Sequence, residues 1–459
     1  MPIVNDAQSR LNRTSVKSIL TPRTEDDVRQ AILAAGRSGD SISVAGGRHS
    51  MGGQQFGTDT VHLDMRGMAG IVDFDRERGL IEVESGIMWP ELIGHLHENQ
   101  TGSGTVWSVR QKQTGIDRVS VGGSLSSNIH GRGLQFPPFV SDIESFRMLD
   151  AEGRSVRCSR NENQELFALA IGGYGLFGVV THVTLRLVPR CVVKRMVEVI
   201  AVRNLMPRVD AAIDDGFIFG DCQYSIDLHG DEEFHPGVFS CYRPVSDDTP
   251  VVEATRKMSP SDWADLYRLA RTDKEKAFAK YEQFYLGTSG QVYWSDAHQL
   301  SNVFEGYDAV VSADQGTEMI TEVYVDRESL IPLLTAVRRD FVEHGVDMTY
   351  GTIRFIEPDV ETFLPWAVER SVCIVCNLHV THTPEGIEKA KGDFRRIIDR
   401  VIEHGGRFYL TYHPWATREQ VEACYPRFPE FLAAKLEYDP ERRFQSDWYR
   451  HYAGLFADA

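Results

Sequence analysis

The chain has 459 residues, of which 42% are hydrophobic and 25% are charged, and its formal net charge is −17. A chain of this length exceeds the size at which one hydrophobic core keeps growing, so we expect two domains. The acidic balance argues against nucleic acid and anionic membrane surfaces as partners, because both attract basic faces.

The cysteines and the N-terminus indicate the compartment. The chain has seven cysteines, an odd number at irregular spacing, which predicts reduced thiols. Cys373 and Cys376 form a CxxC, but no second pair follows, so we expect no metal there. The first residues carry no apolar signal region, and no apolar run reaches membrane-spanning length. The sequence therefore predicts a cytoplasmic protein with no membrane insertion.

Residues 24–37 are predicted as the first long helix. Thr24 is the N-cap candidate, acidic residues fill the first turn, and apolar residues recur on one face. Strands are expected at 41–45 and 60–64. A helix between strands makes a small α/β unit.

The stretch 46–54 between those strands contains four glycines around His49. Glycines so close together let the backbone turn with positive φ and present bare N–H groups to an anion such as a pyrophosphate. Taken alone, the stretch is equally compatible with an ordinary turn.

A second glycine-rich run, 119–133, follows a predicted strand at 79–84 and a predicted helix at 89–99. Small residues, hydroxyls and an amide dominate the run. We expect no core helix from this composition, but a backbone that passes close against a flat ring or phosphates.

The third run, 172–178, matches GxGxxG at Gly173, Gly175 and Gly178. The dinucleotide fingerprint needs a strand before the motif and a helix after it. Here a short helix at 165–170 precedes the motif and an alternating strand at 179–188 follows it. We therefore reject a Rossmann fold.

The three runs together resemble the FAD domain of the vanillyl-alcohol oxidase superfamily, the PCMH-type flavoproteins. The ending, 438–447, also looks like this superfamily, so the resemblance covers essentially the whole chain. The chain is most similar to the aldonolactone and alditol oxidases and to decaprenylphosphoryl-ribose oxidase, a likeness that extends to 403–409. Where that last enzyme has a lysine, this chain has Tyr412 or His413, which points to a different substrate. The matching segments are Ala45-Gly46-Gly47-Arg48-His49-Ser50, Ser120-Val121-Gly122-Gly123-Ser124 with Ile129-His130-Gly131, and Gly172-Gly173-Tyr174-Gly175-Leu176-Phe177-Gly178-Val179-Val180-Thr181.

The fold that this resemblance implies is α+β: a PCMH-type FAD-binding domain of two α/β subdomains, and a cap domain whose antiparallel sheet is covered by helices. The FAD-binding domain would span 1–190 and the substrate-binding cap 191–407. Residues 408–459 would return to the FAD domain. Predicted cap strands are 193–202, 222–228, 318–325, 349–356 and 373–381; predicted cap helices are 255–285 (helix or lid), 330–344 and 389–404.

The resemblance also implies the cofactor-binding residues. The first run would wrap the FAD pyrophosphate, the second would line adenosine, ribityl and isoalloxazine, and the third would close over the flavin. In relatives the histidine at the His49 position bonds to the flavin 8α-methyl, and a neutral imidazole is a suitable nucleophile. A histidine that only hydrogen-bonds a phosphate is the alternative. No cysteine lies in 105–120, so we expect no second covalent link. The implied residues are Gly46, Gly47, Arg48, His49, Ser50, Met51, Gln54, Ser120, Gly122, Gly123, Ser126, Ser127, Ile129, His130, Gly131, Gly175, Gly178 and Val180.

Polar side chains on the predicted cap strands are the catalytic candidates. A buried polar residue must be paired or must touch ligand, and a satisfied structural role remains the alternative for each. Strand alternation places Asn377 and His379 on one face. His379 and His382 would point to opposite faces, so no metal is expected. The candidates are Tyr412, His413, Arg354, Glu322 and His379.

The sequence thus predicts an FAD-dependent oxidoreductase that oxidises an alcohol carbon of a polyol, sugar or aldonolactone by hydride transfer to flavin N5. Tyr412, His413 or His379 would take the hydroxyl proton, and O2 or another acceptor would reoxidise the flavin. A 2-hydroxy-acid dehydrogenase on the same scaffold is the alternative, and it would need two cationic groups in the cap pocket. A non-catalytic flavin-binding protein is a more distant alternative.

Overall fold

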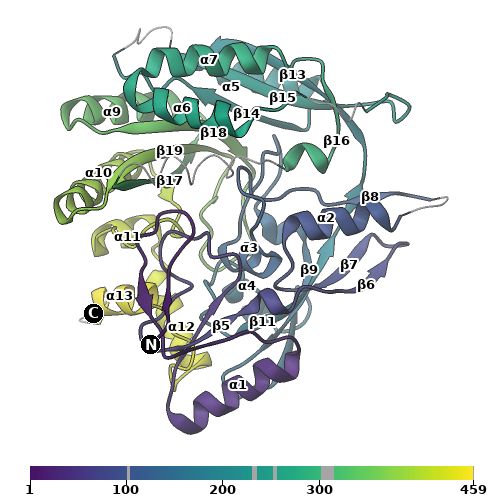
Figure 1. The fold of residues 1–459 in the computed structure, drawn as a ribbon, viewed down its shortest axis with the longest axis vertical. Coiled ribbons are helices and arrows are strands. Elements are labelled where there is room, and N and C mark those ends of the chain that lie inside the picture. The colour runs from purple at the N-terminus through teal and green to yellow at the C-terminus, as the bar shows by residue number, and fades with distance from the viewer. Residues whose placement is uncertain (101–103, 230–234, 252–255, 301–314, 458–459) are drawn as a thin grey trace.

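In the computed structural model, the described residues are 1–100, 104–229, 235–251, 256–300 and 315–457. The chain has a lower half built on two small sheets and an upper half built on one large sheet (Figure 1). The predicted α+β fold class is confirmed.

The lower half begins with a parallel sheet in the order β3-β5-β4 and the helix α1. Thr24 caps α1 through a capping box with Asp27, as the acidic first turn predicts. Apolar residues of α1 pack on this sheet in a small core. The bounds are β1 (Ile3–Val4), β2 (Thr14–Ser15), β3 (Ser18–Leu20), α1 (Glu25–Ser38), β4 (Ile42–Ala45) and β5 (Val61–Asp64).

The second sheet of the lower half is antiparallel, in the order β10-β9-β11-β7-β6. Its third strand, β11, follows the GxGxxG match directly, and α4 precedes that match. The rejection of a Rossmann fold is therefore confirmed. The bounds are β6 (Ile71–Asp75), β7 (Leu80–Glu84), α2 (Trp89–Glu98), β8 (Trp107–Ser108), α3 (Val121–Ser127), β9 (Ile143–Leu149), β10 (Ser155–Ser159), α4 (Gln164–Ala170), β11 (Val179–Arg186) and β12 (Val188–Pro189).

The expectation that the second glycine-rich run forms no core helix is wrong. Residues Val121–Ser127 form the short helix α3, capped by the Ser120 hydroxyl. Val121 and Leu125 are fully buried. A Cβ added at Gly122 would lie 2.7 Å from the Ser85 Cβ. The small residues therefore serve a helix that packs very close to the neighbouring backbone.

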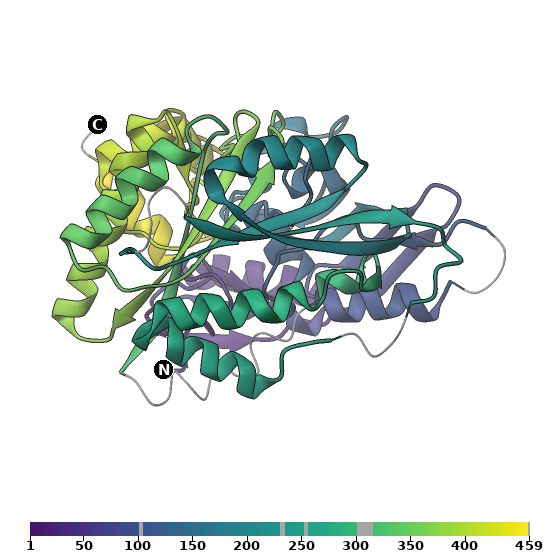
Figure 2. The ribbon, with the colours of Figure 1, turned by 90° about the horizontal axis from the view of Figure 1, so that it is seen from above.

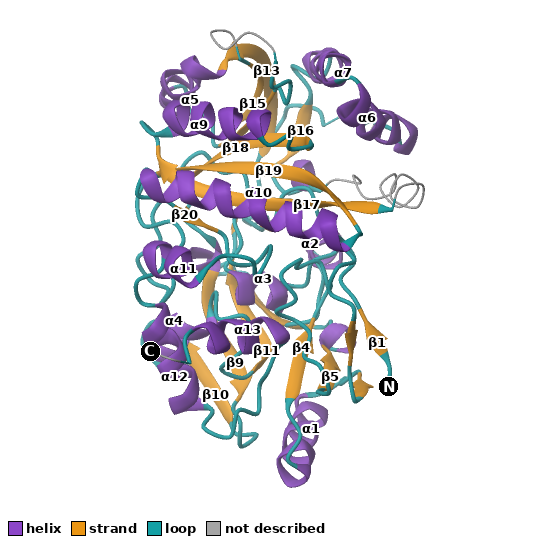
Figure 3. Ribbon diagram, turned by 90° about the vertical axis from the view of Figure 1, so that its left-hand side faces the viewer, coloured by secondary structure: helices purple, strands orange, loops and turns teal. Residues whose placement is uncertain are grey.

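The upper half is an antiparallel sheet in the order β16-β13-β15-β14-β18-β19-β17-β20, with helices on both of its sides (Figure 2). The helix α10 lies along β17 and β19 (Figure 3). The bounds are β13 (Val192–Ala201), α5 (Leu205–Asp214), β14 (Phe219–Tyr224), β15 (Pro236–Val245), α6 (Pro260–Thr272), α7 (Lys274–Leu286), β16 (Val292–Trp294), β17 (Gly316–Asp326), α9 (Leu330–Glu343), β18 (Met348–Ile356), β19 (Ser371–Thr381), α10 (Pro384–Glu403) and β20 (Arg407–Phe408).

Three boundaries of the upper half differ from the predictions. The strand expected at 222–228 ends at Tyr224. Of the expected helix or lid 255–285, residue 255 lies outside the described residues, and the remainder contains two helices, α6 and α7. The helix expected to begin at Lys389 begins at Pro384, because Thr383 caps it and proline suits the first helical turn.

The end of the chain lies in the lower half, beside the N-terminal strands (Figure 1). The Ile42 amide donates to the Arg443 carbonyl at 2.6 Å, and the Gln445 amide donates back to Ile42 at 2.8 Å. Phe444 is buried in the small core under α1. The closing helices are α11 (Arg418–Cys424), α12 (Phe428–Tyr438) and α13 (Asp447–Leu455).

Candidate active site

A groove in the lower half is lined by all three glycine-rich runs together with residues that follow β20. Fifteen of the eighteen residues proposed for the cofactor line it, and so do Tyr409 and Thr411, to which the sequence did not point. The predicted residues in the lining are Gly46, Gly47, Arg48, His49, Ser50, Gln54, Ser120, Gly122, Gly123, Ser126, Ser127, Ile129, Gly175, Gly178 and Val180.

The first glycine pair is required for space and not for positive φ. Within the loop, positive φ occurs at Arg48 and Gly53, whereas Gly46 and Gly47 have ordinary angles. A Cβ at Gly46 would lie 1.9 Å from the Ser120 Oγ, and a Cβ at Gly47 would lie 2.2 Å from a backbone carbonyl oxygen. The loop therefore packs directly against the residues that lead into α3.

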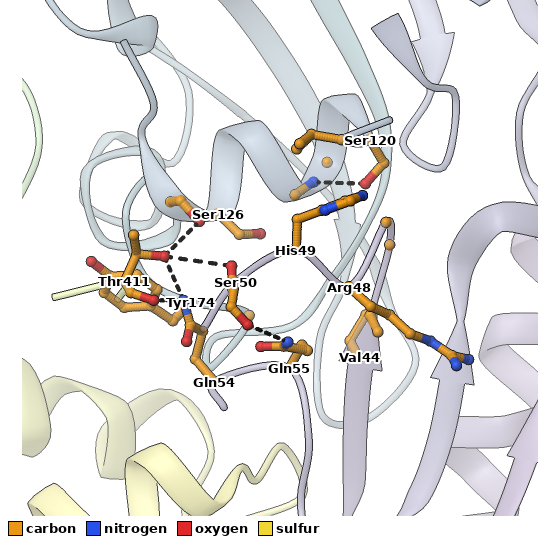
Figure 4. Close-up of a pocket in the computed structure, with 18 of the residues that line it drawn as sticks. Val44, Arg48, His49, Ser50, Gln54, Gln55, Ser120, Ser126, Tyr174 and Thr411 are labelled. Atoms are coloured by element: carbon orange, nitrogen blue, oxygen red, sulfur yellow. Dashed lines mark hydrogen bonds between the residues drawn. The ribbon is translucent and has the colours of Figure 1, made fainter. Parts of the chain in front are cut away.

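The segment after β20 is tied to this loop by hydrogen bonds. The Gln54 Nε2 donates to Thr411, at 2.5 Å to its hydroxyl and 3.1 Å to its carbonyl, and the Gly52 amide donates to the same carbonyl at 3.0 Å. Figure 4 shows Ser50 and Gln54 pointing toward Thr411. The groove is therefore completed by residues far from its glycines in sequence.

His49 is a half-buried residue of the groove wall. Burial, with a smaller contribution from Arg118, lowers the pKa of its imidazole to about 4. The ring is therefore neutral at physiological pH, which is the protonation state that a nucleophile requires.

A second cavity, of about 810 Å³, lies against the upper sheet and the helices α6 and α7. Gln113, Ile116 and Tyr412 line both this cavity and the groove. The two spaces therefore meet at these three residues, and a ligand in the groove can face a ligand in the cavity.

Four side chains converge on the Glu322 carboxylate at this junction. Tyr412 donates to Oε1 at 2.9 Å, and Tyr324 donates to Oε2 at 3.0 Å. The His130 Nε2 lies 2.9 Å from Oε2, and the Arg354 Nη1 lies 3.5 Å from Oε1. All five residues are buried, so the carboxylate is held in one place by partners from both halves of the molecule.

The partners of Glu322 determine its charge. Burial raises its pKa, but His130 and Arg354 outweigh burial and hold the pKa at about 2. Burial and the Glu322 carboxylate raise the pKa of Tyr412 well above its usual value. The site therefore contains a carboxylate and a neutral phenol that donates to it.

A buried lysine shapes the wall at the junction. The Lys112 side chain is fully buried, pairs with Asp117 at 2.7 Å, and donates to the carbonyls of Gln113 and Ile116 at 2.8 and 3.2 Å. Burial lowers the pKa of Lys112 to about 8, so the ammonium form predominates at pH 7. Lys112 therefore fixes the loop whose residues separate the groove from the cavity.

Two catalytic candidates lie apart from the Glu322 cluster. His413 contacts Thr321 and the α10 residue Phe394, on the face of the sheet opposite Glu322, because successive strand residues alternate. Burial and Arg395 lower the pKa of His413 to about 3. His379 pairs with Glu318 at 2.9 Å, four positions along β17 from Glu322, which corresponds to roughly 13 Å.

Three residues proposed for the cofactor are not in the groove lining. Met51 is packed in the core, and the Gly131 amide donates to Gln111. His130 belongs to the Glu322 cluster, and its Nδ1 lies 3.1 Å from the Gly131 carbonyl. The His130 ring therefore lies between two oxygen atoms, those of the Gly131 carbonyl and the Glu322 carboxylate.

His130, Glu322 and Cys373 offer ligand atoms within 4.8 Å of one another, a spacing compatible with a metal ion. Burial and Glu322 raise the pKa of the Cys373 thiol well above its usual value, so it remains protonated. Arg354 already places a positive charge beside Glu322. These three residues are therefore better suited to hydrogen bonding with one another than to binding a metal cation.

Comparison with known proteins shows which family this chain resembles. Residues 16–159 match a protein family described as an FAD binding domain. An L-gulono-1,4-lactone dehydrogenase of Mycobacterium tuberculosis is 23% identical over 95% of this chain and 96% of its own length. Mouse (Mus musculus) L-gulonolactone oxidase is 26% identical over 37% of each chain, and Debaryomyces hansenii D-arabinono-1,4-lactone oxidase is 26% identical over 44% of this chain and 37% of its own. The resemblance to PCMH-type FAD-linked oxidases is confirmed.

The groove fits FAD on its own features. Six glycines line it, so much of its wall is bare backbone that can approach phosphates or a flat ring. The buried polar atoms Gln54 Oε1, Gln55 Oε1 and Ser85 Oγ belong to lining residues and have no hydrogen-bond partner among the described residues. Within the same parts of the chain, no helix combines the length and hydropathy needed to cross a membrane.

Proposed function

Because the chain is an FAD-linked oxidoreductase related to sugar-lactone oxidases and dehydrogenases, we propose that it oxidises an alcohol carbon of a polyol, sugar or aldonolactone. The observation that carries the proposal is the Glu322 cluster at the junction of groove and cavity. Bound FAD supplies a hydride acceptor at flavin N5. A small-molecule alcohol in the cavity would present its C–H bond at that junction.

The cluster suits the proton transfer that accompanies loss of the hydride. Since Tyr412 donates its hydrogen to Glu322, its oxygen is free to accept the hydrogen of the substrate hydroxyl. That hydroxyl becomes strongly acidic as the carbonyl forms, so a weak acceptor suffices, and the proton moves through Tyr412 to Glu322. The Arg354 guanidinium would hold another hydroxyl of the substrate and so orient the carbinol carbon at the junction.

His49 is the proposed tether of the cofactor. Its neutral ring would bond to the 8α-methyl carbon of the flavin, with loss of one proton from each partner. The two electrons released would leave through O2 or another acceptor, which is also the acceptor proposed for each turnover.

The 2-hydroxy-acid dehydrogenase is the second candidate. It requires two cationic groups in the cavity, and Arg132 lines the cavity beside Arg354. The sequence did not point to Arg132. A carboxylate next to the oxidised carbon would pair with these two residues.

An anaerobic screen tests both candidates. Polyols, aldonolactones, 2-hydroxy acids and aromatic alcohols are mixed with the holoenzyme, and loss of the oxidised-flavin absorbance is followed. Bleaching by polyols or aldonolactones supports the first candidate. Bleaching by 2-hydroxy acids alone would replace it with the second.

A further inference from the structure

The wall of the second cavity carries more basic than acidic side chains, although the chain as a whole has a net charge of −17. Among the described lining residues the acids are Asp221 and Glu322. The basic ones are Arg132, Arg195, Arg256, Lys257 and Arg354. A cavity lined in this way attracts anions.

Arg132 is the cation best placed to hold one. Its carbonyl accepts from the Gly220 amide of β14 at 2.8 Å, which fixes its backbone at the cavity wall. Its Nε is buried with no hydrogen-bond partner, and its Nη1 reaches only the Tyr242 hydroxyl at 3.4 Å. The carboxylate of Asp221, on the same cavity wall, raises the pKa of Arg132 but forms no ion pair with it in the described part of the chain.

Arg195 adds a second positive charge to the same wall of the cavity. Its Nε donates to Ser240 at 2.7 Å, and its guanidinium lies 5.4 Å from the ring centroid of Tyr242 and 4.7 Å from that of Tyr285. The Tyr242 ring is therefore close to two guanidinium groups, since the Arg132 guanidinium lies 6.0 Å from its centroid. Such aromatic contacts stabilise a cation without supplying a counter-charge.

A buried guanidinium is best satisfied by a carboxylate or other oxyanion that pairs with it directly. Arg354 has Glu322 at 3.5 Å, whereas Asp221 raises the pKa of Arg132 through its charge and forms no ion pair with it among the described residues. We propose that the substrate is an acidic polyol, a sugar acid or sugar phosphate, whose oxyanion binds Arg132 while its carbinol carbon lies beside Tyr412. This rests on the proposed alcohol oxidation and specifies its substrate class.

The test compares matched substrates on the holoenzyme: neutral D-glucitol, D-gluconate as the carboxylate and D-glucitol 6-phosphate as the phosphate. The variants are Arg132→Gln, Arg132→Lys, and Arg243→Gln as a control on an exposed arginine of β15. In anaerobic flavin reduction we expect Arg132→Gln to raise the half-saturating concentration of the anionic substrate at least about tenfold. Arg132→Gln should leave the limiting rate of flavin reduction and the half-saturating concentration of the neutral substrate unchanged. Arg132→Lys should restore part of the affinity for the anionic substrate. The control should match the wild type.

The outcomes separate this proposal from the proposed function. Equal use of neutral and anionic substrates by the wild type, or no effect of Arg132→Gln, overturns the anion site and leaves alcohol oxidation standing. If none of the three bleaches the flavin, D-gluconate and inorganic phosphate are titrated against the flavin spectrum. A perturbation that Arg132→Gln abolishes supports the anion site while alcohol oxidation fails, and an identical response in both proteins overturns it. The anion that binds more tightly shows whether the site prefers a carboxylate or a phosphate.

Discussion

Replacing Glu322 with glutamine changes one buried atom and disturbs every contact of the cluster. Tyr412 and Arg354 approach one oxygen of the carboxylate, and Tyr324 and His130 approach the other. An amide must turn its NH2 group toward one of these pairs, so two donors then face a donor. The charge that compensates Arg354 is lost at the same time.

The expected loss of stability follows from the pKa of Glu322. The pKa is about 2 in the folded protein against an ordinary value of 4.5, a difference worth about 3 kcal/mol. Because the folded pKa is depressed, this stability is present above about pH 4.5 and is lost as the pH falls toward 2. We expect Glu322→Gln to lower the free energy of unfolding by about 3 kcal/mol at neutral pH, and by about 1 kcal/mol less near pH 4. The rate of flavin reduction should fall about 100-fold.

Urea unfolding of the holoenzyme, followed by tryptophan fluorescence, measures the stability difference at both pH values. Glu430→Gln is the matched control, because Glu430 forms an ion pair with Arg427 but is 63% exposed. Its stability and reduction rate should equal those of the wild type. The proposed role of the cluster is refuted if Glu322→Gln has the same free energy of unfolding as the control. It is also refuted if Glu322→Gln reduces flavin at the wild-type rate.

Four further predictions concern the cofactor and the proton path. Acid-precipitated wild type should keep its flavin and His49→Ala should release it; release from the wild type would exclude the tether. Because the pKa of His49 is about 4, covalent incorporation of FAD into apoprotein should proceed at one rate between about pH 6 and 8, and a rise through this interval would contradict a neutral ring. Gly46→Ala should lose FAD in gel filtration, because its Cβ would lie 1.9 Å from a hydroxyl oxygen, whereas Gly94→Ala, with nothing within 4 Å, should retain it. Tyr412→Phe should slow flavin reduction at least about tenfold with unchanged FAD content, and an unaltered rate would remove Tyr412 from the proton path.

The sequence predicts the elements that depend on local patterns. The capped first helix and the strand after the GxGxxG match follow from the cap residue and from alternation. Glycines mark the groove, although the reason at Gly46 is the approach of Ser120 and not positive φ. That approach joins residues far apart in sequence, so no local pattern reveals it.

The Glu322 cluster depends on such distant contacts. Glu322 and Arg354 are predictable as polar residues on buried strands, but His130 reaches Glu322 across 192 positions. Tyr412 and His413 are equivalent candidates in the sequence, and only the packing of His413 against α10 separates them. Arg132 lies in the second glycine-rich run, but its place in the cavity wall depends on its pairing with β14, which no local pattern reveals.

The most direct test of alcohol oxidation is anaerobic reduction of the bound flavin by a polyol deuterated at the carbinol carbon. We predict that deuterium slows the bleaching several-fold, and that the product is the corresponding carbonyl compound with that deuterium removed. Bleaching with the deuterium retained on the carbon, or binding of polyols, aldonolactones and sugar acids without any bleaching, would contradict hydride transfer from an alcohol carbon.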